Sequence, residues 1–168
     1  LSCSLSLKYF FLFTSASLLP PSLGGWFVIQ HTSGLGVWPQ GGRATNGARL
    51  VLGSKNLANQ AYVFVWTAKK SIKHVTSGMC INMRGPNLVL QKGCDSKRTM
   101  KFKKTGSGFK NIATKSYVMA GASLSGRPGI PLSTRKTQTP GSAFSFKSKR
   151  SILKADTQGS TKKQQLHI

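Results

Sequence analysis

The sequence predicts an all-β fold built from three similar units, and three observations support this prediction. Short strand-like phrases recur in the same order between Trp26 and Lys154. They repeat at intervals of about forty residues, which is typical of a repeated supersecondary unit. The segments between them are rich in Gly, Ser, Asn and Pro, which favour turns, and no stretch has the apolar periodicity of a helix.

The first recurring phrase is a short apolar strand that opens each unit. Ile29, Ile72 and Phe109 occupy the same place in this phrase. It appears as Val28–His31, Ser71–His74 and Gly108–Asn111, and Ser151–Lys154 closes the set. A turn follows each opening phrase, and then a second apolar strand that reaches Val37, Ile81 or Val118.

The third phrase is a run of three apolar residues, and an aromatic residue follows it at a fixed spacing. The runs are Leu50–Leu52, Leu88–Leu90 and Ile130–Leu132. Phe64, Phe102 and Phe144 each lie fourteen residues after the first member of a run. Each unit is therefore expected to hold about four strands, and the aromatic residues are expected to be buried.

Three pseudo-repeats of four strands predict a β-trefoil. A propeller blade also has four strands, but a propeller closes with four to eight blades. In a trefoil, Ile29, Ile72 and Phe109 are expected to point inward and share one core with the three phenylalanines.

The charge of the chain excludes most kinds of enzyme. Lys and Arg number 25, whereas the acidic residues are Asp95 and Asp156, and the formal net charge is +23. A glycosidase needs two carboxyl groups at its site, and a Ser-His-Asp triad needs one. No HExxH, CxxC, GxGxxG or P-loop spacing is present, so neither an enzyme nor a cofactor is predicted. The positive field favours polyanions such as nucleic acids or sulfated glycans.

The two ends of the chain differ in composition from the repeats. Lys8, the apolar run Tyr9–Phe13 and the small residues after it are typical of a secretory signal, although a disordered leader or translated non-coding sequence fits as well. The run is too short to cross a membrane, so no transmembrane segment is expected. The predicted division is a leader over 1–25, the β-trefoil over 26–154 and a disordered polar tail over 155–168. Secretion is expected on this basis.

The repeats resemble those of ricin-B-like β-trefoil lectins. The resemblance lies in Ile72–Gly78, Leu88–Leu90 and Phe102. The first unit, with Trp38-Pro39-Gln40-Gly41-Gly42 and then Asn46, is similar to the HPxGG repeat of mussel-type lectins for galactose and N-acetylgalactosamine. The resemblance implies a shallow sugar site in each repeat.

Several residues that such a site would use are replaced in this chain. Trp38 stands in the place of the HPxGG histidine, and Lys55 and Leu57 in the places of a later Asp and His. Trp38 is expected to be either a platform for a sugar or a plug at the rim of the barrel. The remaining candidates for sugar binding are Gly41, Gly42, Asn46, Asn82 and Asn87, and the two glycines also suit a turn with positive φ. The expected function is that of a non-catalytic module for galactose-type glycans with partly degenerate sites, the first unit being the most intact.

Cys80 and Cys94 occupy the two places where ricin-B-like repeats carry a disulfide. The resemblance implies that they are bonded, and two free buried thiols are the alternative.

Lysines and arginines gather in several predicted turns, including Lys101, Lys103 and Lys104. They predict either a binding surface for polyanions, as an alternative to sugar binding, or simply a solvated coat.

Overall fold

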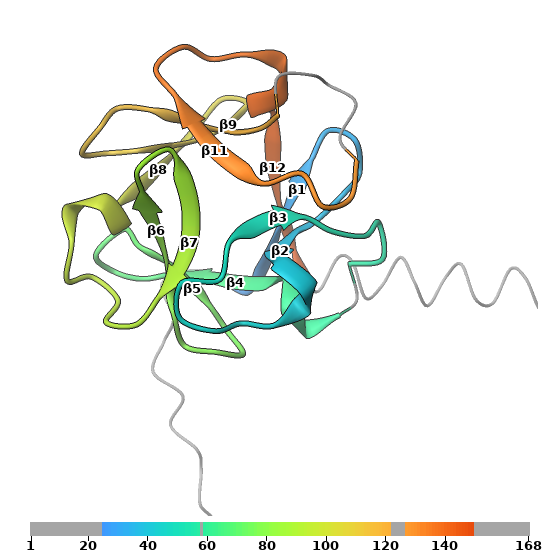
Figure 1. Ribbon diagram of the computed structural model, residues 1–168, viewed down its shortest axis with the longest axis horizontal. Helices are drawn as coiled ribbons and strands as arrows, with labels where there is room; N and C mark the ends of the chain where they lie inside the picture. The colour runs from blue at the N-terminus through green and yellow to red at the C-terminus, as the bar shows by residue number, and fades with distance from the viewer. Residues whose placement is uncertain (1–24, 58, 122–126, 150–168) are drawn as a thin grey trace, which may run out of the picture.

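The computed structural model describes residues 25–57, 59–121 and 127–149, and these form twelve strands in three groups of four (Figure 1). The first unit contains β1 (Phe27–His31), β2 (Val37–Pro39), β3 (Leu50–Leu52) and β4 (Val63–Trp66). The second contains β5 (Ile72–His74), β6 (Cys80–Arg84), β7 (Asn87–Gln91) and β8 (Phe102–Thr105). The third contains β9 (Gly108–Asn111), β10 (Tyr117–Ala120), β11 (Leu132–Arg135) and β12 (Phe144–Ser148).

Between Phe27 and Ser148, the helical elements of the described residues are four short 3₁₀ turns. They are η1 (Gln40–Gly42), η2 (Gln60–Tyr62), η3 (Arg98–Met100) and η4 (Pro140–Ser142). The last three precede β4, β8 and β12 and so repeat once in each unit. Within the described residues, no helix is long and apolar enough to cross a membrane.

The first and fourth strands of each unit form a closed antiparallel barrel. β1 pairs with β12 and with β4, β4 pairs with β5, and β8 pairs with β9. An isolated bridge between Ser71 and Lys101 joins the edges of β5 and β8, and Phe144 N donates to Ser107 O beside β9 and β12. Within the part of the chain that the structure describes, this closure leaves no long free edge in the barrel.

The second and third strands of each unit form three hairpins that cap one end of the barrel. β2 pairs with β3, β6 with β7, and β10 with β11. Arg49 bridges to Val89, Val51 to Pro131, and Ser133 to Asn87, so each hairpin contacts the next one around a common centre. Figure 1 shows β3, β7 and β11 converging at this centre. The predicted β-trefoil is therefore confirmed.

The predicted core is also confirmed. Ile29, Ile72 and Phe109 have no exposed surface and belong to one cluster of buried side chains. Phe64, Phe102 and Phe144 are buried in the same cluster. Burial of each such side chain stabilises the fold by about 2 kcal/mol.

The alignment of the third apolar run was wrong by two residues. Val37, Ile81 and Val118 pair with Leu52, Leu90 and Thr134. The third-unit counterpart of Leu50–Leu52 is therefore 132–134 and not Ile130–Leu132. Pro131 has no N–H for a hairpin ladder, and it stands just before β11 where it makes only an isolated bridge.

Several predicted segments lie outside the described residues. They are the leader, apart from Gly25, the closing phrase Ser151–Lys154 and the polar tail over 155–168.

Candidate functional site

The structure does not bring the six candidate sugar-binding residues together. Trp38 and Gly41 line one pocket, and Asn46 and Asn82 line a second. Asn87 lines a third, smaller hollow next to the second. Gly42 lies against the ring of Trp38. The candidates of the first unit are thus divided, because the loop that carries Asn46 extends onto the second unit.

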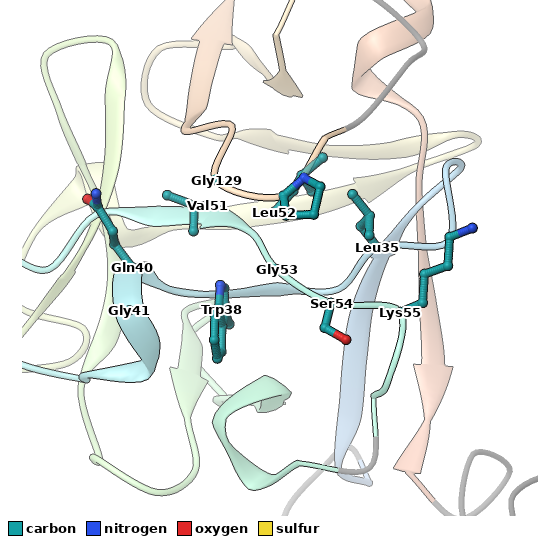
Figure 2. A pocket seen from close by; sticks show the side chains of 11 residues that line it. Leu35, Trp38, Gln40, Gly41, Val51, Leu52, Gly53, Ser54, Lys55 and Gly129 are labelled. Atoms are coloured by element: carbon teal, nitrogen blue, oxygen red, sulfur yellow. The ribbon is translucent and has the colours of Figure 1, made fainter.

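The first pocket, called here the Trp38 pocket, lies between the β2–β3 hairpin and a segment of the third unit. Its volume is about 560 Å³. Figure 2 shows Trp38 below β3, with Gln40 at one end of the pocket and Ser54 and Lys55 at the other. The lining residues are Leu35, Trp38, Gln40, Gly41, Val51, Leu52, Gly53, Ser54, Lys55, Pro128 and Gly129. The pocket therefore combines an apolar floor with a few polar groups at its ends.

Trp38 is half-buried and held from two sides. Its ring stacks on Tyr62, with 5.2 Å between ring centroids and an angle of 2° between the planes. It also lies so close to Gly53 that a Cβ atom on that residue would approach Cδ1 and Nε1 to 2.7 Å. The hydroxyl of Tyr62 accepts a hydrogen bond from Ser54 N at 2.6 Å, which fixes the supporting ring. Trp38 thus packs against Tyr62 and Gly53 and also lines a pocket, and both of its predicted roles stay predictions.

The turn after Trp38 has the backbone conformation that its glycines predict. Gly41 and Gly42 have φ values of 67° and 71°, in the left-handed region that favours glycine. This turn places Gly41 on the wall of the pocket and Gly42 against Trp38.

The second pocket has a volume of about 500 Å³ and is polar. Asn82 lines this pocket, is only 4% exposed, and has both ends of its amide occupied. Its Nδ2 donates to Gln91 Oε1 at 2.6 Å, and its Oδ1 accepts from Thr99 Oγ1 at 2.6 Å. Asn82 therefore shapes this pocket while its amide is already paired within the protein.

The two pockets are related by the threefold repeat. Val37 and Ile81 hold the same place in their hairpins, so Trp38 corresponds to Asn82 and Gly53 to Gln91. A large ring over a glycine in the first unit is replaced by a hydrogen-bonded pair of amides in the second. The same place in the third unit holds Met119 and Arg135. One scaffold therefore presents three chemically different surfaces.

The three lysines of the predicted cluster have different surroundings, with Lys101 just before β8 and Lys103 and Lys104 on it. Lys101 is partly buried, and its Nζ lies 2.7 Å from Asp95 Oδ1. Lys103 is exposed on β8, while the Nζ of Lys104 lies 4.8 Å from the ring centroid of Phe146. Burial alone would raise the pKa of Asp95, but hydrogen bonds from Lys101, Ser71 and Thr67 and the charge of Lys101 lower it. Asp95 is thus a structural partner of Lys101.

Cys80 and Cys94 form a disulfide, with an S–S distance of 2.06 Å. The alternative of two free buried thiols is therefore wrong. The bond ties the start of β6 to the turn that follows β7, on the same hairpin that carries Asn82.

Two buried histidines serve the fold. His74 Nδ1 lies 2.9 Å from Ser77 Oγ, and its Nε2 lies 3.1 Å from Ala61 O, so the neutral ring ties a turn to η2. Burial lowers the pKa of His74, and the hydrogen bond to Ala61 opposes this effect only in part. His31 occupies the equivalent place in the first unit, and burial lowers its pKa too. Its Nδ1 lies 2.8 Å from Ser33 Oγ, while Gly141 lies next to its Nε2 without a hydrogen bond of good geometry.

Sequence reasoning missed four contributors to the Trp38 pocket. Tyr62 and Gly53 support the ring, and Pro128 and Gly129 form the opposite wall. The available signal for Gly53 was its place directly after an apolar strand, where a residue without a side chain leaves room for a ring. The third-unit wall follows only from the contact of Leu52 with Gly129 and Ile130, which no local pattern reveals.

No family model and no curated protein matches this sequence. Solved structures do match it. The C-half of the earthworm R-type lectin in complex with GalNAc has a TM-score of 0.64 and 12% identity, over 74% of this chain and 98% of that one. The agglutinin from Abrus precatorius has a TM-score of 0.65 and 17% identity, over 79% of this chain and 51% of that one. The designed threefold symmetric protein ThreeFoil has a TM-score of 0.63 and 8% identity, over 74% and 99%.

These matches agree with the resemblance that the repeats predicted. The chain spans about half the length of the Abrus agglutinin chain and nearly all of the earthworm domain. Identities this low show a shared fold and leave the ligand open. The particular likeness of the first unit to mussel-type lectins stays a prediction. The chain therefore has the β-trefoil fold that these lectins share.

Proposed function

We propose that this protein is a non-catalytic carbohydrate-binding module and that the Trp38 pocket binds a neutral galactose-type sugar. The observation that carries the proposal is the position of Trp38, whose ring is stacked on Tyr62 and also lines a pocket with polar ends. An aromatic surface suits the apolar face of a galactose ring, while nearby polar groups suit its hydroxyls.

The polar groups of this pocket are suitably placed for a small ligand. Gln40 is exposed at one end, and Ser54 and Lys55 at the other. The stack on Tyr62 holds the indole in place before a ligand arrives. Such preorganisation reduces the loss of conformational entropy on binding.

The structural comparisons support this class of function. The earthworm R-type lectin that resembles this chain is described with GalNAc bound. A non-catalytic role also fits the pairing of Asp95 with Lys101, which leaves that carboxylate unsuited to acid–base chemistry. Secretion is part of the proposal, and the Cys80–Cys94 disulfide supports it because such bonds persist in oxidising compartments.

The test compares Trp38→Ala with Trp26→Ala in the full chain. Isothermal titration with a neutral galactoside should show at least a roughly tenfold loss of affinity for Trp38→Ala, because a stacking aromatic is lost. Trp26 is 48% exposed and lines none of the pockets described, so its variant should bind normally. Gln40→Ala keeps the aromatic stack and should weaken binding several-fold, which covers the case in which Trp38→Ala does not fold. Equal binding by all of these variants would reject the proposal.

Binding of extended polyanions through Lys101, Lys103 and Lys104 remains the second candidate. The exposed position of Lys103 and the net charge of +23 favour it. The ion pair of Lys101 with Asp95 disfavours a site in which all three lysines bind one polyanion together. Replacing the three lysines with Ser should leave neutral-sugar binding unchanged, and loss of heparin binding in this variant together with no galactoside binding by the wild type would favour this candidate.

A further inference from the structure

A small hollow lies at the junction of the first two units, away from Trp38. Its volume is about 260 Å³, and it is lined by Gly47, Arg49, Arg84, Asn87 and Val89. We refer to it as the arginine hollow. It adjoins the second pocket, with which it shares Gly47, Arg84 and Val89. Together they form a continuous depression that presents two arginines.

The fold positions both arginines through the backbone. Arg49 bridges to Val89 of β7 where the first two hairpins meet. Arg84 is the last residue of β6 and pairs directly with Asn87 across the tight turn at Gly85 and Pro86. Gly85 has φ of 60°, which suits the first central position of such a hairpin turn. The two cations therefore come from different units and face one hollow.

Hydrogen bonds fix the walls of the depression. Gly47 N donates to Leu90 O at 2.8 Å, and Leu90 N donates to Ala48 O at 2.8 Å. Lys92 N donates to Asn46 Oδ1 at 3.0 Å. The loop that carries Asn46 is thereby attached to β7, so the site does not have to be ordered when a ligand binds.

The positive charge of this depression is not balanced by a carboxylate. Asp95 is the only acidic residue among those that the structure describes, and it pairs with Lys101. Lys97 adds a third cation to the lining of the second pocket. Two guanidinium groups that line one small hollow repel each other, and an anion between them removes this repulsion.

We propose that the arginine hollow binds the sulfate or carboxylate group of an anionic saccharide, whose ring lies against the adjoining polar pocket. This inference rests on the proposed carbohydrate-binding function and names a second class of ligand for it. Arg is suited to planar and tetrahedral oxyanions, since its guanidinium donates two parallel hydrogen bonds. Gln91, Asn46 and Thr99 bring polar groups for hydroxyls to the adjoining wall.

The lining favours a saccharide over a nucleic acid. Among the described residues, no aromatic side chain lines the arginine hollow or the second pocket, whereas proteins that hold single strands stack bases on aromatic rings.

The threefold repeat provides an internal comparison. At the junction of the first and third units, Gln40 takes the place of Arg84, and Pro131 takes the place of Arg49. The Trp38 pocket accordingly has no arginine in its lining. The two junctions are therefore expected to differ in the charge of the sugar that they accept.

The experiment measures binding of a neutral galactoside, its sulfated form and its sialylated form to the full chain at 150 mM salt. The variant is Arg49→Gln with Arg84→Gln, where the second change copies Gln40. The matched control is Arg135→Gln with Arg127→Gln, because both residues are exposed and line none of the pockets described. Each double variant loses two charges.

The wild type should bind at least one anionic sugar roughly tenfold or more tightly than the neutral one, because the anionic group makes charge-assisted contacts with both arginines. Arg49→Gln with Arg84→Gln should remove this preference and leave neutral-sugar affinity unchanged, and the control should keep the preference. The sulfated and sialylated arms identify the anion. An equal loss in the control, retention of the preference by the arginine variant, no wild-type preference, or full competition by an oligonucleotide would each overturn the inference. Failure of the Trp38 proposal can be distinguished from these outcomes, because it concerns binding of the neutral galactoside and not the preference for the anionic sugar.

Discussion

Trp38 occupies the space that a side chain at position 53 would need. A Cβ on Gly53 would lie 2.7 Å from the indole and 2.5 Å from the hydroxyl of Tyr62. In the second unit the same two places hold Asn82 and Gln91, whose side chains are hydrogen-bonded at 2.6 Å. The two members of each pair therefore compensate for one another in volume, and neither member can change alone without disturbing the pocket.

Gly53→Ala should destabilise the protein and disturb the Trp38 pocket. The added methyl forces the indole or Tyr62 to move, and overpacking of this kind costs about 1–3 kcal/mol. Urea denaturation measures the loss, and near-ultraviolet circular dichroism reports the displaced ring. Gly106→Ala is the matched control, because a Cβ there meets no atom within 4 Å. A Gly53→Ala protein as stable as the control would contradict the close packing of Trp38 and Gly53.

The Cys80–Cys94 disulfide should contribute measurably to stability. It closes a loop with a sequence separation of 14, and loss of such a cross-link destabilises by about 3 kcal/mol through the entropy of the unfolded chain. Cys80→Ala with Cys94→Ala should lower the free energy of unfolding by this order. A reducing agent should destabilise the wild type and leave the double variant unaffected. Identical sensitivity of both proteins to the reductant would contradict the bond.

Asp95→Asn should weaken the fold by about 1 kcal/mol, because Lys101 loses its ion pair in a partly buried place. The pKa of Asp95 is lowered in the folded state. The carboxylate therefore contributes stability above its unfolded pKa of about 3.9, and this contribution is lost as the pH falls through the folded pKa. The difference between wild type and variant should thus shrink in acid and in high salt. Lys103→Ser, which removes an exposed charge, should change stability by less than about 0.5 kcal/mol. A difference that is constant from pH 7 to pH 2 would exclude this role for Asp95.

The sequence was sufficient to predict the architecture because the repeated positions are buried. Ile29, Ile72 and Phe109 must be apolar to fill one shared core, so their recurrence survives even where the surface diverges. The register of the third unit was not predictable in this way. Ile130, Pro131 and Leu132 look like the other apolar runs, yet the bridges place Leu132 opposite Ala120 and leave Pro131 before the strand. Apolar pattern alone cannot distinguish these registers.

The candidate sites were less predictable than the core because they form between units. Asn46 and Trp38 are close in sequence, but they line different pockets after the loop crosses to β7. Arg49 and Arg84 likewise line one hollow only because two hairpins are in contact. Such contacts join residues far apart in the chain, and no local signal in a single sequence identifies them.

The buried histidines should make the stability of the protein depend on pH between about 7.5 and 5. The pKa of His74 in the folded state is below its ordinary value of 6.5, and burial is the main cause. The unfolded chain therefore binds a proton more readily than the folded chain in this range, and protonation favours unfolding. The stability that the neutral ring provides is fully present above pH 6.5, and it is lost as the pH falls from there toward the folded pKa.

His74→Asn tests this dependence with a residue that the fold already uses. Asn111 occupies the equivalent place in the third unit, where its Nδ2 donates to Thr99 O at 2.8 Å. The variant should be somewhat less stable at pH 7.5 because a smaller side chain leaves a void. Its free energy of unfolding should nevertheless fall between pH 7.5 and pH 5 by only about half as much as that of the wild type, because His31 still titrates. The converse change, Asn111→His, should steepen the dependence. If denaturation curves gave the same slope against pH for the wild type and both variants, neutral His74 would not be a source of the stability, and its burial would have no consequence for folding in this pH range.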